Sequence, residues 1–182
     1  PWPRLHLRDQ VKKYSGIDFF DYPDVDSLRE AMNLVGVNVT NQLSWGGLLD
    51  KLISDKVEPN LVQPCFLIDY PVAMSPLAKR KDNDPRLVER FEGFIAKMEI
   101  CNAFTELNDP IDQRERFEQQ EQLRETFEGE ETDRLDEDFL VAIEHGMPPT
   151  GGLGIGIDRL TMLLTDNHSI REVVLFPQLR NN

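Results

Sequence analysis

Apolar residues recur at helical spacing in three separate stretches of the first third of the chain. Apolar residues three and four apart form one face of a helix, and a following glycine, such as Gly16 or Gly36, commonly ends it. Ser27 and Glu30 have the spacing of a capping box at the start of the second stretch. The apolar positions of the three predicted helices are Leu7, Val11 and Tyr14, then Leu28, Ala31, Met32 and Val35, then Trp45, Leu48, Leu49, Leu52 and Ile53.

The pattern changes to that of a sheet after residue 64. The short apolar run 65–70 is bounded by prolines, which is typical of a buried strand. Residues 77–85 are polar and predict a loop, whose three basic residues we expect to face water. A nucleotide or tRNA contact of these residues is the alternative. Residues 87–107 predict a hairpin that turns at Ala96-Lys97.

A charged segment follows the hairpin. Asp109 and Pro110 predict the cap and first turn of a helix to about residue 128, and its sparse apolar positions indicate that most of it faces water. The acidic run 128–138 has no metal-ligand spacing and is expected to be a solvated connection. A short helix is predicted around residues 139–143.

The segment Gly151-Gly152-Leu153-Gly154-Ile155-Gly156 predicts a glycine-rich strand that runs directly into an apolar helix over residues 157–164. Glycines remove side chains from a strand face, so that a large flat ligand can lie against the backbone. Asp158-Arg159 places a planar guanidinium at the strand–helix junction, where it suits a phosphate or an aromatic base. Close packing of a neighbouring helix would also explain the glycines.

Four collinear blocks resemble one known family. Residues 151–177 resemble motif 3 of class II aminoacyl-tRNA synthetases, and specifically of lysyl-tRNA synthetases. The similarity extends from Pro1 to Arg180. The further blocks are Asp69-Tyr70-Pro71 with Ser75-Pro76-Leu77-Ala78-Lys79, then residues 99–110 (Glu-Ile-Cys-Asn-Ala-Phe-Thr-Glu-Leu-Asn-Asp-Pro), then Leu175-Phe176-Pro177.

The resemblance implies an α+β fold, an antiparallel sheet flanked by helices as in class II synthetases. Residues 1–182 would be the C-terminal portion of the catalytic domain, with motif 3 at about 151–177. The anticodon-binding domain, motif 1 and the arginine-bearing motif 2 are expected upstream of Pro1. This chain is therefore expected to be inactive alone, and the intact protein to be a homodimer. A parallel nucleotide-binding sheet is disfavoured, because its phosphate-loop motifs are absent from the sequence.

Glu92 and Glu99 stand on the two strands of the predicted hairpin. If Ala96-Lys97 is a two-residue turn, Glu99 lies opposite Phe94, which shares a face with Glu92. Two such carboxylates suit Mg²⁺ that also binds substrate phosphates. The resemblance implies that both glutamates hold magnesium on ATP. Two exposed strand glutamates are the alternative, and a three-residue turn would place them on opposite faces.

Asn102, Phe104 and Glu106 are spaced by two and so share one strand face. They offer an amide, an aromatic wall and a carboxylate, which together match a ligand with a polar head, an apolar stem and a cationic tip. Lysine has this form. The resemblance implies that Asn102 and Phe104 line the amino-acid pocket and that Glu106 pairs with the ε-ammonium. Phe104 as a core residue remains open.

The resemblance gives Arg159 and Glu99 catalytic roles, with Arg159 against adenine and reaching towards the γ-phosphate. Gly154 and Gly156 would form the floor under lysine and ATP. An ion pair of Arg159 with Asp158 or another acid is the competing explanation, because the chain has 33 acidic residues. The three histidines follow no metal or triad spacing, and we assign them no catalytic role.

Composition limits the partners. The net charge of −13 disfavours a broad nucleic-acid surface, so tRNA would meet a local patch or protein outside this chain. No apolar run reaches the length of a membrane span, and no signal peptide is evident. Cys65 and Cys101 lack CxxC spacing and are expected to be buried thiols rather than a disulfide. We expect a cytoplasmic protein.

The predicted function is that of a lysine–tRNA ligase, which activates lysine with ATP and transfers it to tRNA(Lys). A paralogue that attaches a lysine-type amino acid to elongation factor P is one alternative, although that family tends to carry alanine where this chain has Gly154. A non-catalytic interaction module derived from a synthetase is another. Aspartyl and asparaginyl synthetases would need a cationic pocket in place of Glu106.

Overall fold

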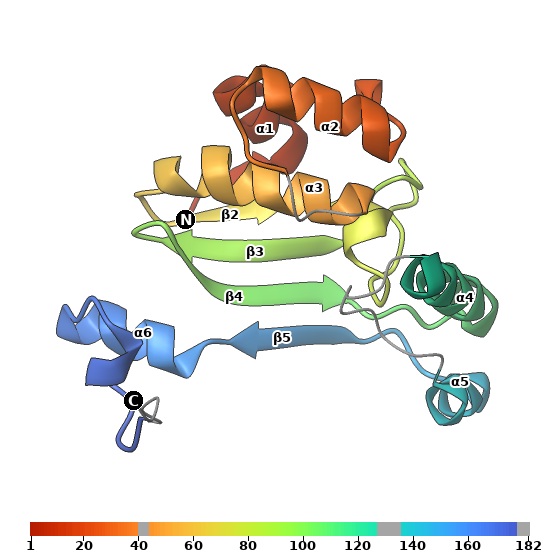
Figure 1. Ribbon diagram of the computed structural model, residues 1–182. Coiled ribbons are helices and arrows are strands. Elements are labelled where there is room, and N and C mark those ends of the chain that lie inside the picture. Colours follow the sequence, from red (N-terminus) through yellow and green to blue (C-terminus); the bar gives the residue numbers. More distant parts are fainter. Residues whose placement is uncertain (40–43, 127–135, 178–182) are drawn as a thin grey trace, which may run out of the picture.

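The computed structural model of the chain describes residues 1–39, 44–126 and 136–177. These residues form one five-stranded sheet, in the order β1-β2-β3-β4-β5, together with helices at its side and ends (Figure 1). The strands are β1 (Arg4–His6), β2 (Cys65–Ile68), β3 (Arg90–Ile95), β4 (Met98–Thr105) and β5 (Gly151–Ile155). The helices are α1 (Leu7–Ser15), α2 (Val25–Leu34), α3 (Trp45–Leu52), α4 (Pro110–Thr126), α5 (Glu137–Glu144) and α6 (Ile157–Thr165). Short helical turns are Phe19–Asp21, Ile53–Val57, Glu58–Asn60, Val72–Met74 and Ile170–Glu172.

The sheet is mainly antiparallel. β4 runs antiparallel to both β3 and β5, which confirms the predicted α+β class. The pair β1–β2 is parallel, and this pair was not predicted. β1 has only three residues before α1 begins, which is too short for an alternating pattern to be visible in the sequence.

The hairpin turn is the predicted two-residue turn. Ala96 and Lys97 have φ angles of 51° and 69°, so both lie in the left-handed region that this kind of hairpin turn requires. The turn sets Ile95 opposite Met98 and Phe94 opposite Glu99.

The three predicted N-terminal helices are all present, and they form a layer beside β2 and β3 (Figure 1). The cap of α2 differs from the prediction. Asp24, not Ser27, is the N-cap, and its side chain accepts a hydrogen bond from the backbone N–H of Ser27. Residues 7–94 supply the main hydrophobic core, whose fully buried side chains include Leu7, Phe19, Leu28, Met32, Leu48, Leu49, Leu52, Leu67, Tyr70 and Phe94.

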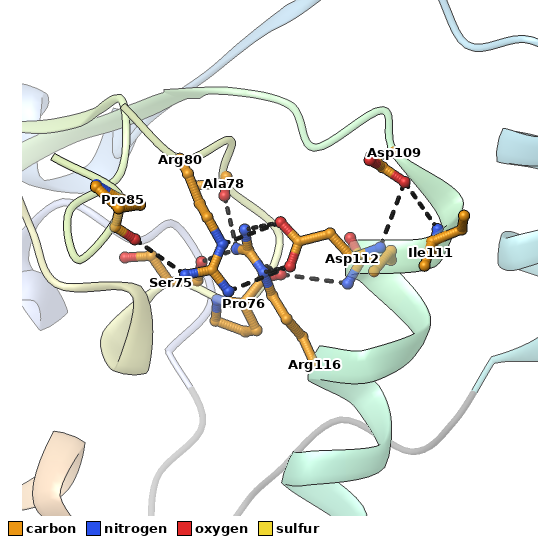
Figure 2. A network of polar contacts seen from close by, with 10 residues as sticks. Ser75, Pro76, Ala78, Arg80, Pro85, Asp109, Ile111, Asp112 and Arg116 are labelled. Atoms are coloured by element: carbon orange, nitrogen blue, oxygen red, sulfur yellow. Dashed lines mark hydrogen bonds and ion pairs between the residues drawn. The ribbon is translucent and has the colours of Figure 1, made fainter. Parts of the chain in front are cut away.

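α4 buries two polar side chains, although most of the helix is exposed or partly exposed, as predicted. Gln113 is fully buried and Arg116 is 3% exposed. Figure 2 shows Arg116 reaching from α4 to the neighbouring loop, where its Nη1 donates to the carbonyl oxygens of Ser75, Pro76 and Ala78. The buried carbonyls of an irregular loop need such donors, so here a polar helix face packs better than an apolar one would.

Asp112 joins this network to a second arginine. Its carboxylate accepts hydrogen bonds from Arg116 at 2.7 and 2.8 Å and from Arg80 at 3.2 and 3.3 Å (Figure 2). The arginine side chains, Arg116 first, lower the pKa of Asp112 to about 2. Lys81 likewise pairs with Asp69 at 2.5 Å. The prediction that the basic residues of loop 77–85 simply face water is therefore wrong for Arg80 and Lys81.

The first turn of α4 is capped as predicted, since Asp109 Oδ1 accepts hydrogen bonds from the backbone N–H groups of Ile111 and Asp112. Most of the acidic run 128–138 lies outside the described residues. No helix in the described part of the chain combines the length and the apolar character that a membrane crossing requires.

Candidate functional site

The predicted site residues of three strands share one face of the sheet. Glu92 of β3 pairs with Asn102 of β4, which pairs with Gly154 of β5. Directly paired residues of neighbouring strands point to the same face. Glu92 also pairs with Leu67 of β2, which is fully buried. The face that packs against helices at β2 therefore continues over β4 and β5, where Gly154 is exposed.

A bulge in β4 places Glu99 on this same face. The register jumps between Phe94, which pairs with Glu99, and Gly93, which pairs with Cys101, so that Ile100 is the extra residue. In a regular strand, Glu99 and Asn102 would point to opposite faces, because they are three residues apart. The extra residue reverses that alternation. The prediction that Glu99 and Asn102 serve one site depends on this bulge, which the sequence analysis did not predict.

A cavity of about 380 Å³ lies beside the bulge, at the junction of β5 and α6. Five of the eight predicted site residues line it: Glu99, Asn102, Gly154, Gly156 and Arg159. Glu92, Phe104 and Glu106 are not among the lining residues.

Glu92 is held by two side chains that the sequence analysis missed. Arg90 Nη2 donates to one carboxylate oxygen at 2.5 Å, and the Tyr70 hydroxyl donates to the other at 2.6 Å. The guanidinium of Arg90 also lies over the Tyr70 ring, 4.6 Å from its centroid. Burial raises the pKa of Glu92, the charge of Arg90 opposes that rise, and the charge of Glu99 adds to it. The charge of Glu99 therefore disfavours the ionised form of Glu92.

Glu99 is paired with Arg159. Arg159 Nη1 donates to the carbonyl oxygen of Glu99 at 2.8 Å and to its carboxylate at 3.0 Å. The ion pair that was the competing explanation for Arg159 is thus present in the structure, and its partner is Glu99 rather than Asp158. Half of the Arg159 side chain is exposed, so the guanidinium remains accessible to a ligand.

A magnesium ion fits the chemistry of this part of the site. Glu92 and Glu99 present hard oxygen ligands, and their mutual repulsion would be relieved by a cation. No group of three or more His, Cys, Asp or Glu side chains gathers for a metal ion in residues 1–39, 44–126 and 136–177. Two carboxylates without further protein ligands suit Mg²⁺, which takes its remaining ligands from water and substrate phosphates.

Glu106 differs from the other two glutamates because it has no cation. Its carboxylate makes no ion pair or side-chain hydrogen bond with the residues the structure describes, although it is partly buried. Burial raises the pKa of Glu106. A desolvated carboxylate without a partner is costly, and a cationic ligand would offset that cost.

Gly152 makes room for this carboxylate. A Cβ atom on Gly152 would come within 2.2 Å of Glu106 Oε1. The sequence analysis named Gly154 and Gly156 but not Gly152. By contrast, a Cβ atom on Gly154 would have only the carbonyl oxygen of Asn102 near it, at 3.8 Å. Packing within the chain therefore requires no glycine at position 154, and its missing side chain enlarges the cavity instead.

Phe104 combines both roles considered for it. It is partly buried and packs against the main core, while it shares the site face with Asn102 through pairing with Arg90 and Gly152. Of the residues that the sequence analysis missed, Arg90 carries a detectable signal, because it stands two residues before Glu92 on the same strand face. Tyr70 carries none, since it reaches Glu92 only through the fold.

Comparisons with known proteins point to one family. The family model described as tRNA synthetases class II (D, K and N) matches residues 1–180. A lysine–tRNA ligase of Dehalococcoides mccartyi is 58% identical over 181 residues, which are 100% of this chain and 36% of that protein. A lysine–tRNA ligase of Chloroflexus aurantiacus is 56% identical over 99% of this chain and 36% of its own length. A lysine–tRNA ligase of Moorella thermoacetica is 52% identical over 180 residues, which are 99% of this chain and 37% of that protein. The chain thus spans little more than a third of the curated relatives it matches.

Proposed function

The chain belongs to the class II tRNA synthetases of the D, K and N group, and from this premise we propose that the protein containing it is a lysine–tRNA ligase. The observation that carries the choice of lysine is Glu106, a partly buried carboxylate without a cation on the glycine-bearing face of the sheet. A site for an acidic amino acid or its amide would not leave a carboxylate there, because that charge would repel or fail to satisfy the ligand.

The substrate lysine lies along β4 in this proposal. Asn102 and Glu106 are four residues apart, roughly 13 Å along a strand. An extended lysine is of that order from its carboxylate to its ε-ammonium, once a hydrogen bond is added at each end. The ring of Phe104 stands between the two polar residues and would pack against the apolar stem. Gly154 leaves the cavity open beside Asn102.

ATP occupies the other end of the site, beside Glu99, Gly156 and Arg159. Arg159 is permanently charged and half exposed, so it can move from Glu99 to the γ-phosphate or lie against adenine. Glu92 and Glu99 would hold Mg²⁺, and the ion when bound would neutralise charge on the phosphates.

The reaction is the in-line attack of the lysine carboxylate on the α-phosphorus of ATP. It yields lysyl-adenylate and pyrophosphate, after which lysine passes to the 3′ end of tRNA(Lys). The residues of this chain orient the two substrates and stabilise negative charge, and they carry no acid–base step. The arginine that grips the α-phosphate, the anticodon-binding domain and the surface that forms a homodimer belong to the rest of the protein. We place the protein in the cytoplasm.

ATP–pyrophosphate exchange with the intact protein tests this proposal. Lysine should support exchange, whereas aspartate, asparagine, arginine and methionine should support little. Exchange that is supported by aspartate or asparagine but not by lysine would contradict the assignment. Release of AMP together with a lysine ester on tRNA(Lys) would separate a tRNA ligase from a lysine ligase acting on a protein.

A further inference from the structure

Arg90 makes an unusual number of contacts for one side chain of the site. Its side chain is 15% exposed. Nε donates to Asn102 Oδ1 at 3.0 Å, Nη2 donates to Glu92, and Nη1 donates to the Met74 carbonyl oxygen at 2.9 Å and to Ser75 Oγ at 2.7 Å. An arginine provides five N–H donors in a rigid planar fork. These hydrogen bonds therefore fix both the guanidinium of Arg90 and the groups that accept from it.

The bond to Asn102 decides which way the amide of Asn102 faces. Arg90 Nε carries a hydrogen and cannot accept, so the amide atom that meets it must be the oxygen. The amide nitrogen of Asn102 then points away from Arg90. It has no hydrogen-bond partner in the described part of the chain, and Asn102 lines the cavity.

We propose that Arg90 is a positioning residue that commits the Asn102 amide to act as a hydrogen-bond donor towards the amino-acid substrate. This inference rests on the proposed function and adds the residue that orients the carboxylate end of the lysine pocket. Without Arg90, the Asn102 amide could rotate and present its oxygen, which would repel a substrate carboxylate.

The backbone and Tyr70 make this position firm. The Met74 carbonyl and Ser75 hydroxyl anchor one edge of the guanidinium, and the Tyr70 ring lies under its face. The segment that includes Ser75 is also bound by Arg116, whose Nη1 donates a hydrogen bond to the Ser75 carbonyl oxygen (Figure 2). Asn102 is therefore oriented from a fixed point of the fold and not by a mobile surface side chain.

A double-mutant cycle in the intact protein tests the inference, with Arg90→Lys and Asn102→Ala alone and together. Lysine KM and kcat are measured by ATP–pyrophosphate exchange, and lysine affinity is measured by calorimetry without ATP. Arg90→Lys keeps the charge and loses the fork, so lysine KM should rise about tenfold. In the Asn102→Ala background, the same change should add less than about twofold, because Arg90 acts through that amide.

Ser75→Ala is the matched control. It removes one of the two hydrogen bonds that Arg90 Nη1 donates, while the Met74 carbonyl still holds the same nitrogen and the bond to Asn102 remains. Lysine KM should therefore stay within about twofold while the unfolding temperature falls. Asn102→Asp keeps a partner for Arg90 and replaces the amide nitrogen with an acceptor. It should abolish measurable lysine binding without unfolding the protein, and it carries the test if Arg90→Lys does not fold.

The possible results distinguish failure of the proposed function from failure of the role proposed for Arg90. A parent protein that activates no lysine would overturn the proposed function and this inference with it. A parent that activates lysine, with equal effects of Arg90→Lys in both backgrounds, would overturn the inference alone. Lysine binding by Asn102→Asp at the parent's affinity would do the same.

Discussion

The two edges of the sheet differ in what packs against their strands. At β1–β3, the helices α1–α3 and the strands share one core, which residues 7–94 build. At β5 and beyond, apolar side chains remain open to solvent. Leu153 is 61% exposed and Leu175 and Phe176 are each 89% exposed. The chain thus contains two contrasting regions, which we call the covered half (residues 7–94) and the open half (residues 151–177), with β4, α4 and α5 between them.

The difference separates residues that packing explains from residues that it does not. In the covered half, nine of the twelve apolar positions given for the predicted helices are buried and the other three are partly buried, and burial of this kind stabilises a fold. In the open half, Gly154 has no close neighbour, and the nearby Glu106 has no cation. Features that cost stability or contribute none to it are expected where a ligand binds. Stability and chemistry should therefore respond to different substitutions.

The largest expected effect is that of replacing Glu106, which lies between the covered and open halves. Glu106→Gln keeps the volume and removes the charge that would pair with the ε-ammonium. Lysine discrimination should fall by on the order of 2–5 kcal/mol in kcat/KM, with little change in ATP affinity. Because burial raises the pKa of Glu106, the folded state favours its protonated form, and its charge costs stability at neutral pH. The variant should therefore unfold at an equal or higher temperature. Unchanged lysine exchange would remove Glu106 as the selector.

The covered half should show the reverse pattern. Leu48→Ala in α3 removes a fully buried side chain and should lower the free energy of unfolding by about 3 kcal/mol. Leu164→Ala in α6 is the matched control, because Leu164 is 76% exposed in this chain and should cost less than about 0.5 kcal/mol. Denaturant unfolding of the 182-residue chain measures both. Equal costs would mean that the open half is packed in solution.

The paired carboxylates lie where the two halves meet. Glu92→Gln or Glu99→Gln should raise the magnesium concentration that half-saturates ATP–pyrophosphate exchange by about tenfold or more, because a ligand charge beside the phosphates is lost. A magnesium titration of the intact protein at fixed lysine gives this value. Unchanged magnesium dependence in both variants would return the two glutamates to ordinary strand residues, held by Arg90 and Arg159.

The network around Asp112 should affect stability without affecting specificity. Its pKa is about 2 in the folded chain, below the ordinary value of 3.8, so its ionised form stabilises the fold by about 2 kcal/mol above pH 4. That contribution should disappear as the pH falls from about 4 to about 2. Asp112→Asn should lower the free energy of unfolding at pH 7 by a similar amount and flatten its dependence on pH in this range. A variant whose acid unfolding follows that of the parent would contradict this assignment.

Much of this fold could be predicted from local pattern. The helices of the covered half have an apolar stripe of ordinary spacing, and the Ala96-Lys97 turn has the length that joins paired strands. The polar burial of α4 could not be predicted, because Arg116 is buried by loop carbonyls that are distant in sequence. The strand β1 was missed because three residues show no period.

The site was less predictable than the fold, although its residues were named. Spacing by two correctly placed Asn102 and Phe104 on one strand face, but only the bulge at Ile100 brings Glu99 to that face. An added residue in a strand leaves no mark in the hydrophobic pattern here. Tyr70 and Gly152 act through contacts across the sheet, with Glu92 and Glu106 respectively, and such contacts are not visible along the chain.

The smallest expected effect is that of Gly152→Ala, which adds one methyl group. It is also the sharpest test of the contrast between the covered and open halves. A Cβ atom on Gly152 would lie 2.2 Å from Glu106 Oε1 and 3.4 Å from its Cδ, so Gly152→Ala must displace the carboxylate. The displaced atoms are the end of a flexible side chain, and the fold can absorb their movement at little cost. Lysine KM should rise about tenfold, since a charge-assisted pair depends on the position of that carboxylate, while ATP KM and the unfolding temperature change little.

Gly151→Ala is the control for Gly152→Ala, on the same strand and with the same change. Its added methyl group would meet only the carbonyl oxygen of Phe104, at 4.0 Å, so lysine KM should remain at the parent value. Pyrophosphate exchange and thermal unfolding of both variants in the intact protein complete the test. If Gly152→Ala lowered stability and left lysine KM unchanged, Gly152 would be a packing residue like those of the covered half. The division between stability and chemistry would then fail at the residue that lies closest to Glu106.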